Sequence, residues 1–382
     1  MKKILYWAPC LSKVGTYRST INSALSVSKY LSSRFSVKII NACGEWNEEK
    51  DKFNKNNIDL IDLGYSYFKY LPKNGYLNSR ISYLIIILFS ALPLIKLIKK
   101  EKPDFIIIHL ITILPLFLNY IFNFNSKIIL RISGFPKLNP FRKFFWKFFL
   151  KKVYRITCPS KDLLCQLLDL NLFENKKLSF LPDPILNIYK FKNNNEDNYL
   201  FNNIQKKNYF IAAGRLTKQK NFLYLINEFH KFTKKNENFN LLIFGEGEKY
   251  DELKNEIKNN NLMDRIYLMG YSKNIYNYMK NAKGFILSSL WEDPGFVLIE
   301  AAMCNLFIIS SDCKNGPIEF LNGGKNGLLF SNNQENALRK SLEKFLMIDE
   351  NTIKEKKILA KKNCKKYTLF YHQKILRNLL ED

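Results

Sequence analysis

The sequence predicts an α/β protein made of two doubly wound domains. Its 382 residues exceed the size at which a single hydrophobic core keeps growing. Short β-rich runs alternate with longer helical stretches, a pattern typical of parallel sheets covered on both faces. The alternation stops at a polar, proline-containing stretch, residues 181–203, and then starts again. We therefore place a boundary near residue 183, between domains at 1–183 and 184–365.

The predicted strands of the first domain come in the order "KILYWAP", "FSVKII", "DFIIIHL", "KIILRIS" and "RITCPS", with helical stretches such as "STINSALSVSKYLSS" and "FRKFFWKFFLKKV" between them. The second domain repeats the alternation with "YFIAAGRL", "NLLIFGEG", "RIYLMGY", "GFILSS" and "LFIISSD" as strands. Ligands of such open sheets bind at the carboxyl ends of the strands, so the loops there are the first place to look for a site.

The bulk composition restricts the class of protein. A hydrophobic content of 47% excludes a mostly disordered chain. The net charge of +26 would favour nucleic acid, anionic lipid or a polyanionic substrate as partner. Asn, Lys and Ile are abundant throughout, however, so part of this charge reflects a general compositional bias. The seven cysteines lack metal-ligand spacing, which indicates reduced thiols in a cytoplasmic protein.

Two apolar segments resemble membrane spans in composition. We expect Leu84–Ile95 to be too short for a span, and it contains Pro93. The segment Phe105–Phe122 is expected to divide into a buried strand ending at His109 and a helix around Pro115. The apolar run at the start of the chain is too short for a signal peptide.

The stretch "SLWEDPGFVLIEAA", residues 289–302, carries the strongest chemical signal. Asp293 and Pro294 are predicted to serve as the N-cap and first residue of a helix. The free backbone N–H groups near Gly295, Phe296 and Val297 would then carry the positive end of the helix dipole, which suits a diphosphate.

Two carboxylates frame the same turn. Glu292 precedes the helix and Glu300 lies about one and a half turns into it. Carboxylates accept hydrogen bonds from vicinal hydroxyls, so one could hold a transferred sugar and the other a ribose. The alternative is an acidic cluster that only stabilises the start of a helix.

The stretch "AAGRLTKQKN" delivers Arg215 and Lys220 to the same edge of the sheet. Two cations opposite a helix N-terminus would neutralise a pyrophosphate leaving group. Taken alone, an Arg and a Lys in so basic a chain are more often solvated surface charges, but the neighbouring helix start favours a shared role.

Several motifs in one order resemble those of the retaining nucleotide-sugar glycosyltransferases of family 4, which have the GT-B fold of two Rossmann-like domains facing across a cleft. They are "GRLTKQKN", "FGEGEKYDEL", "GYSKNIYNYMKNA", "SLWEDPGFVLIEAA" and "SSDCKNGPIEFLNGGKNGLLF", with weaker similarity upstream at "HL", "LRISGFP", "TCPSKDLL" and "LPDPI". The resemblance also implies that a last helix, about residues 366–382, packs back on the first domain.

The resemblance implies a role for individual residues. Arg215 and Lys220 would bind the donor diphosphate, Glu292 the hydroxyls of the donor sugar, and Glu300 the ribose. The other residues that it implies at the substrate site are His109, facing the donor sugar, and Gly15, Arg131, Gly245, Gly247, Tyr271, Gly295, Phe296 and Val297. No metal and no cofactor is expected beyond the donor itself, for which a uridine diphosphate hexose or N-acetylhexosamine is favoured.

The acceptor is expected to be a lipid-linked glycan or polysaccharide of bacterial surface-glycan synthesis. The N-terminal loop "SKVGTYRST" departs from the glycine-rich segment of the family, and only Gly15 and Arg18 match it. The basic, aromatic stretch at residues 141–155 is consistent with a peripheral contact with an anionic membrane, or with a packed helix that has a solvated basic face.

The residues alone are also compatible with three other functions. A glycoside hydrolase would also use two carboxylates, and a sugar-nucleotide epimerase shares the GT-B fold. The third is a basic, non-enzymatic binder of nucleic acid or of a lipid surface. The Arg/Lys pair and the helix N-terminus indicate an anionic leaving group, which disfavours the hydrolase. On the family resemblance, we expect no nucleic-acid partner.

Overall fold

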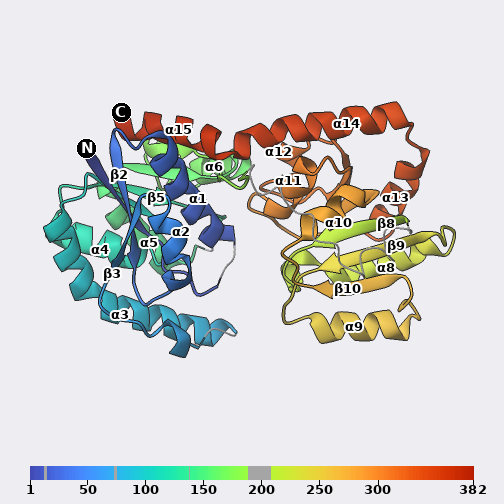
Figure 1. The fold of residues 1–382 in the computed structure, drawn as a ribbon, viewed down its shortest axis with the longest axis horizontal. Helices are drawn as coiled ribbons and strands as arrows, with labels where there is room; N and C mark the ends of the chain where they lie inside the picture. The colour runs from blue at the N-terminus through green and yellow to red at the C-terminus, as the bar shows by residue number, and fades with distance from the viewer. Residues whose placement is uncertain (13–14, 73–74, 137, 188–207) are drawn as a thin grey trace. The chain divides into compact units, whose positions relative to one another are not determined.

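The computed structural model describes residues 1–12, 15–72, 75–136, 138–187 and 208–382. It divides into two compact units (Figure 1), of which the first is Met1–Ile185 with Thr368–Asp382 and the second is Leu186–Tyr367. The last helix, α15 (Leu369–Glu381), therefore belongs to the first unit although it ends the chain. Most of the predicted linker falls on residues 188–207, outside the described residues.

The first unit contains one seven-stranded parallel sheet with the strand order β3-β2-β1-β4-β5-β6-β7. The strands are β1 (Lys2–Trp7), β2 (Phe35–Asn41), β3 (Ile58–Asp62), β4 (Phe105–Ile108), β5 (Lys127–Arg131), β6 (Arg155–Cys158) and β7 (Leu178–Phe180). Its central strands are buried on both faces, as β4 with the sequence FIII illustrates. Continuous apolar runs are typical of parallel strands covered on both sides.

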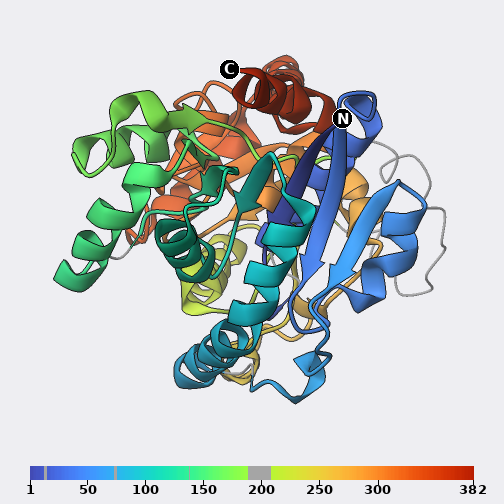
Figure 2. The ribbon, with the colours of Figure 1, turned by 90° about the vertical axis from the view of Figure 1, so that its left-hand side faces the viewer.

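Helices cover the two faces of this sheet (Figure 2). One apolar cluster packs α3 (Tyr76–Glu101), α4 (Ile113–Phe122), α5 (Pro140–Phe149) and α6 (Lys161–Asp169) on one face. The other packs α1 (Gly15–Tyr30), α2 (Lys50–Asn54) and α15 on the opposite face. Leu376 and Leu380 of α15 are each 1% exposed, so the return of the chain is part of the core.

The structure bears differently on the predictions for the two apolar segments that resemble membrane spans. The expected division of Phe105–Phe122 is confirmed, since β4 ends at Ile108 and α4 begins at Ile113. The apolar run Leu84–Ile95 lies inside the 26-residue helix α3, so its own length does not decide whether this helix is a span, and the expectation that it is none stays a prediction. Residues outside the apolar run continue this helix, and Pro93 is accommodated within it. By length and composition alone, α3 is the one helix of the described residues that could cross a membrane.

The second unit repeats the doubly wound design with a six-stranded parallel sheet of order β10-β9-β8-β11-β12-β13. Its strands are β8 (Asn208–Ala213), β9 (Phe239–Phe244), β10 (Ile266–Gly270), β11 (Gly284–Leu287), β12 (Ile308–Ser311) and β13 (Leu328–Phe330). Its helices are α8 (Phe222–Thr233), α9 (Tyr250–Asn259), α10 (Ile275–Asn281), α11 (Phe296–Met303), α12 (Pro317–Phe320), α13 (Ala337–Met347) and α14 (Glu350–Asn363). The predicted class, α/β with two doubly wound domains, is confirmed.

Candidate functional site

The reversal of strand order in the second unit positions the candidate site. The chain runs outward from β8 through β9 to β10, then returns to β11 on the other side of β8. In open parallel sheets, ligands generally bind at the carboxyl ends of the two strands that flank such a reversal, here β8 and β11. Arg215 and Lys220 follow β8, and Glu292 follows β11. Residues far apart in the sequence therefore meet at one edge, which we call the β8–β11 rim.

A buried ion pair lies at this rim. Lys220 Nζ lies 2.5 Å from Glu292 Oε1, and the two side chains are only 13% and 6% exposed. Ser289 Oγ donates a hydrogen bond to the same carboxylate oxygen. At Gly214 an added Cβ would lie 2.9 Å from Lys220 Cε, so glycine leaves room for the lysine stem. The pair is thus held in place before any ligand arrives, which lowers the ordering cost of binding.

Arg215 completes the positive charge of the rim in a different way. It is exposed, and no hydrogen bond or ion pair to its guanidinium is found in the part of the chain that the structure describes. A guanidinium in this state can turn toward an incoming phosphate and bind it with two parallel hydrogen bonds. One cation is therefore fixed in a pair and the other is available.

The helix that follows Glu292 begins later than predicted. α11 starts at Phe296, and Gly295 before it has φ +90° and ψ +65°. Because Gly295 lies in the left-handed region, Asp293 and Pro294 are neither N-cap nor first helical residue, and that prediction was wrong. No side chain caps this terminus. The N–H groups of the first turn, at Phe296 and Val297, therefore stay available for an anion, as expected.

Glu300 is fixed by a partner that the sequence did not reveal. Glu300 lies on α11 and is only 4% exposed. The Tyr276 hydroxyl donates a hydrogen bond to Glu300 Oε1 at 2.7 Å. Tyr276 lies on α10, and nothing in its local sequence separates it from the other tyrosines. Ser289 was missed for the same reason, since a serine at the end of a strand is too common to be a signal.

The glycines of "FGEG" serve the packing of two loops. A Cβ at Gly245 would lie 1.9 Å from the Gly214 carbonyl oxygen, and one at Gly247 would lie 2.4 Å from the Leu216 carbonyl oxygen. The loops after β8 and β9 approach closely because both residues lack side chains. Tyr271 follows β10 at the same carboxyl edge and is 71% exposed. The predicted contacts of these three residues with the nucleotide stay predictions.

The remaining predicted residues lie in the first unit. Gly15 is the first residue of α1, after β1, and His109 follows β4 at the corresponding switch point of that sheet. His109 and Arg131 are only 6% and 3% exposed. The Arg131 guanidinium pairs with Asp183 and donates to the Leu181 carbonyl at 2.8 Å. These contacts hold Arg131 in place within the first unit, and the predicted substrate contacts of Arg131 and His109 stay predictions.

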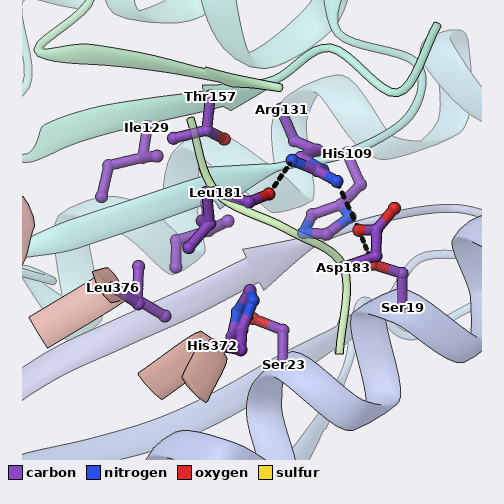
Figure 3. A pocket seen from close by; sticks show the side chains of 11 residues that line it. Ser19, Ser23, His109, Ile129, Arg131, Thr157, Leu181, Asp183, His372 and Leu376 are labelled. Atoms are coloured by element: carbon purple, nitrogen blue, oxygen red, sulfur yellow. Dashed lines mark hydrogen bonds and ion pairs between the residues drawn. The ribbon is translucent and has the colours of Figure 1, made fainter. Parts of the chain in front are cut away.

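A small cavity of about 10 Å³, with room for one water molecule, lies among these buried groups and is lined by both polar and apolar side chains (Figure 3). His109 Nδ1 has no hydrogen-bond partner among the described residues and belongs to the cavity lining. On the other side, His372 of α15 lies 2.7 Å from the Pro182 carbonyl through Nδ1 and 2.9 Å from Ser23 Oγ through Nε2. The carbonyl can only accept, so Nδ1 carries the proton, and the imidazole links α15 to α1 and to Pro182 within the first unit.

Acidification is expected to weaken the first unit through His372. Burial lowers the pKa of this imidazole to about 4, and the nearby Arg131 charge acts in the same direction. The folded pKa lies below the ordinary value, so stability present at neutral pH is lost as the pH falls through that interval. We expect urea unfolding to show a loss of about 3 kcal/mol from pH 7 to pH 4 on this account.

The matched variant His372→Gln keeps a polar side chain but cannot take up a proton. Its free energy of unfolding should fall less steeply over the same pH range than that of the unaltered chain. Equal slopes for both proteins would show that His372 is not the titrating group.

Two comparisons by sequence agree on one family. Residues 195–365 match the family model described as glycosyl transferases group 1. An uncharacterized glycosyltransferase of Methanocaldococcus jannaschii is 32% identical over 256 residues, or 62% of each chain. A Campylobacter jejuni N-acetylgalactosamine-N,N'-diacetylbacillosaminyl-diphospho-undecaprenol 4-alpha-N-acetylgalactosaminyltransferase is 32% identical over 176 residues, or 46% of each chain. The matches thus span about half to two thirds of these relatives.

Solved structures agree over the whole chain. A glycosyltransferase from Rickettsia africae superimposes with a TM-score of 0.78 at 20% identity, over 100% of this chain and 98% of the other. An Anabaena protein in complex with UDP and glucose gives a TM-score of 0.75 at 15% identity, over 100% of both chains. At these identities the likeness establishes the fold. The chain thus has the GT-B fold, and its residues 195–365 match the model of the group 1 glycosyl transferases.

Proposed function

We propose that this protein is a retaining glycosyltransferase that moves a sugar from a nucleoside diphosphate sugar to a glycan acceptor. The observation that carries the proposal is the β8–β11 rim, where a fixed lysine, an available arginine and an uncapped helix N-terminus converge. These groups suit the binding of a diphosphate and the stabilisation of the charge that develops as it leaves. The family match supports the same reaction class.

Each group has a part in the proposed reaction. The bond between the anomeric carbon and the diphosphate oxygen breaks, and the acceptor oxygen bonds to that carbon from the same face. The acceptor proton passes to the departing phosphate oxygen, so the configuration is retained and no protein nucleophile is consumed. Lys220, Arg215 and the N–H groups of Phe296 and Val297 stabilise the departing diphosphate. No divalent metal is needed in this scheme.

The carboxylates hold the rest of the donor. Glu292, oriented by Lys220 and Ser289, accepts hydrogen bonds from sugar hydroxyls, and Glu300, oriented by Tyr276, accepts them from the ribose. The pairing of Lys220 with Glu292 argues against a glycoside hydrolase, which needs a carboxylic acid as proton donor. Glu292 Oε1 already accepts hydrogen bonds from Lys220 Nζ and Ser289 Oγ, so in this site it serves as an acceptor.

The donor is proposed to carry uridine and a hexose or N-acetylhexosamine. The acceptor is proposed to be a lipid-linked or polysaccharide intermediate of surface-glycan synthesis. The Anabaena structure holds UDP and glucose, and the Campylobacter relative is named for a diphospho-undecaprenol substrate. Both features come to this chain by similarity.

Thermal unfolding with a panel of nucleotide sugars tests the proposal. A donor present at about 100 times its dissociation constant should stabilise the protein by about 2.7 kcal/mol, visible as a rise in the unfolding midpoint. The matching nucleoside monophosphate, which lacks the second phosphate, should give a smaller rise. No rise with any nucleotide sugar would contradict the proposal. A product formed from the donor without any acceptor would support the epimerase instead.

A further inference from the structure

Helix α3 carries an apolar stripe on its exposed side. Leu77, Ile81, Leu84, Leu88 and Leu92 recur every three or four residues, which places them on one face of the helix. Each of these residues is between 49% and 74% exposed. A stripe of this length facing water is unusual, since large exposed apolar patches in soluble proteins mark interaction sites.

The opposite face of α3 is anchored in the core of the first unit. Ile86, Leu94 and Ile98 are at most 3% exposed and belong to the apolar cluster that packs α3 to α6 on one face of the sheet. The Ser82 hydroxyl donates to the Pro72 carbonyl at 2.6 Å. If α3 crossed a membrane, these side chains would leave the core. If α3 instead lies along a membrane surface, its buried face stays in the core and its exposed apolar face contacts lipid. Figure 1 shows α3 along the lower edge of the first unit.

The apolar surface continues onto the neighbouring helices. Lys99 Nζ of α3 lies 5.2 Å from the ring of Phe122 in α4, and the rings of Tyr120 and Phe149 join α4 to α5 at 5.0 Å. The exposed large apolar residues of these two helices are Ile113, Phe117, Tyr120, Ile121, Phe122, Phe144 and Phe148. We call the exposed sides of α3, α4 and α5 together the α3–α5 face.

Positive charge borders this face, and negative charge is almost absent from its helices. The only acidic residue in segments 76–101, 113–122 and 140–152 is Glu101, whose carboxylate lies 3.0 Å from Lys38 Nζ. The exposed basic residues of the same segments are Arg80, Lys96, Lys99, Lys100, Arg142, Lys143, Lys147, Lys151 and Lys152. Apolar side chains with a basic border are the composition that binds the headgroup region of anionic bilayers.

We propose that the α3–α5 face is a docking surface for an anionic lipid bilayer, with the α3 stripe inserted at the acyl boundary. A second copy of the chain is disfavoured as the occupant, because pairing two such faces would bring their basic borders together. The stretch at 141–155 contributes its basic residues to the border and Phe144 and Phe148 to the apolar surface, while Trp146, Leu150 and Val153 are at most 5% exposed. The proposal does not depend on sugar transfer, and its test requires no activity.

Cosedimentation of the full chain with lipid vesicles tests the proposal. We expect binding to phosphatidylcholine vesicles that contain about 30 mol% phosphatidylglycerol, and much weaker binding to phosphatidylcholine alone. Leu84→Glu with Leu88→Glu should weaken binding by about tenfold or more, because two charges enter the inserted stripe. Leu346→Glu with Met347→Glu, at two exposed apolar residues of α13, is the matched control and should bind as the unaltered chain does.

A double lysine variant separates the contribution of charge to vesicle binding from that of apolar insertion. Lys96→Gln with Lys99→Gln should weaken binding at low salt, and the difference should shrink at about 0.5 M salt, where charges are screened. If Leu84→Glu with Leu88→Glu fails to fold by circular dichroism, Leu88→Ser alone takes its place.

The outcomes that would overturn the proposal are distinct. Unchanged binding of the stripe variants, or no binding to anionic vesicles, would remove the bilayer as occupant. A dimer in light scattering that Leu88→Ser dissociates would instead identify a second copy. Protein released from anionic vesicles only by detergent, and not by high salt with carbonate, would indicate that α3 spans the bilayer.

Discussion

Lys220→Met is expected to lower the rate of sugar transfer by about two orders of magnitude or more. The ammonium lost in this variant stabilises charge that develops on the leaving diphosphate, so the loss should appear in kcat as well as in kcat/KM. Steady-state kinetics with the donor identified by thermal unfolding measures both. Lys218→Met, an exposed lysine of the same turn, is the matched control and should keep near-normal turnover.

The buried pair makes this substitution costly for stability too. Removing Lys220 leaves the Glu292 carboxylate buried without its cation, which typically costs about 3 kcal/mol or more. The double variant Lys220→Met with Glu292→Gln should regain most of that stability, because no unpaired charge remains. It should not regain transfer. If transfer returned along with stability, Lys220 would act only by holding Glu292, and its contact with the diphosphate would be wrong.

Glu300→Ala should also lower transfer by about two orders of magnitude, in this case through weaker binding of the donor. The expected cause is the loss of hydrogen bonds from Glu300 to the ribose hydroxyls. Titration calorimetry with uridine diphosphate measures the loss directly. With the 2′,3′-dideoxy analogue, which lacks both hydroxyls, the variant and the unaltered protein should bind with similar affinity.

The variant Tyr276→Phe tests whether the Tyr276 hydroxyl positions Glu300. It keeps the ring and removes only the hydroxyl that orients Glu300. We expect a smaller loss of affinity than for Glu300→Ala, and again none with the dideoxy analogue. If Glu300→Ala weakened both ligands equally, Glu300 would serve the packing of α11 and not the ribose.

The alternation of the sequence was enough to predict the fold, and the exceptions have physical causes. Long apolar runs such as those of β1, β4 and β9 were recognised because both faces of each strand are buried. The strands β3, β7 and β13 were missed, since each lies at the edge of its sheet and two of them have only three residues. The extent of α3 was not predicted, because only its central apolar run stands out in the sequence.

At the site, the charged residues were predictable and their partners were not. Arg215, Lys220, Glu292 and Glu300 stand out in the motifs, and the structure brings Lys220 and Glu292 into contact. Ser289 and Tyr276 are common residue types whose role depends on the packing of neighbouring loops. For the same reason no role could be predicted for His372, which belongs to a buried polar network in the structure.

A crystal structure from crystals soaked with uridine diphosphate tests most directly whether the β8–β11 rim binds a diphosphate. We expect the phosphates to accept hydrogen bonds from the N–H groups at the start of α11 and from Arg215 and Lys220, with the ribose on Glu300. A rim left empty at saturating nucleotide, or a nucleotide bound elsewhere on the second unit, would contradict this.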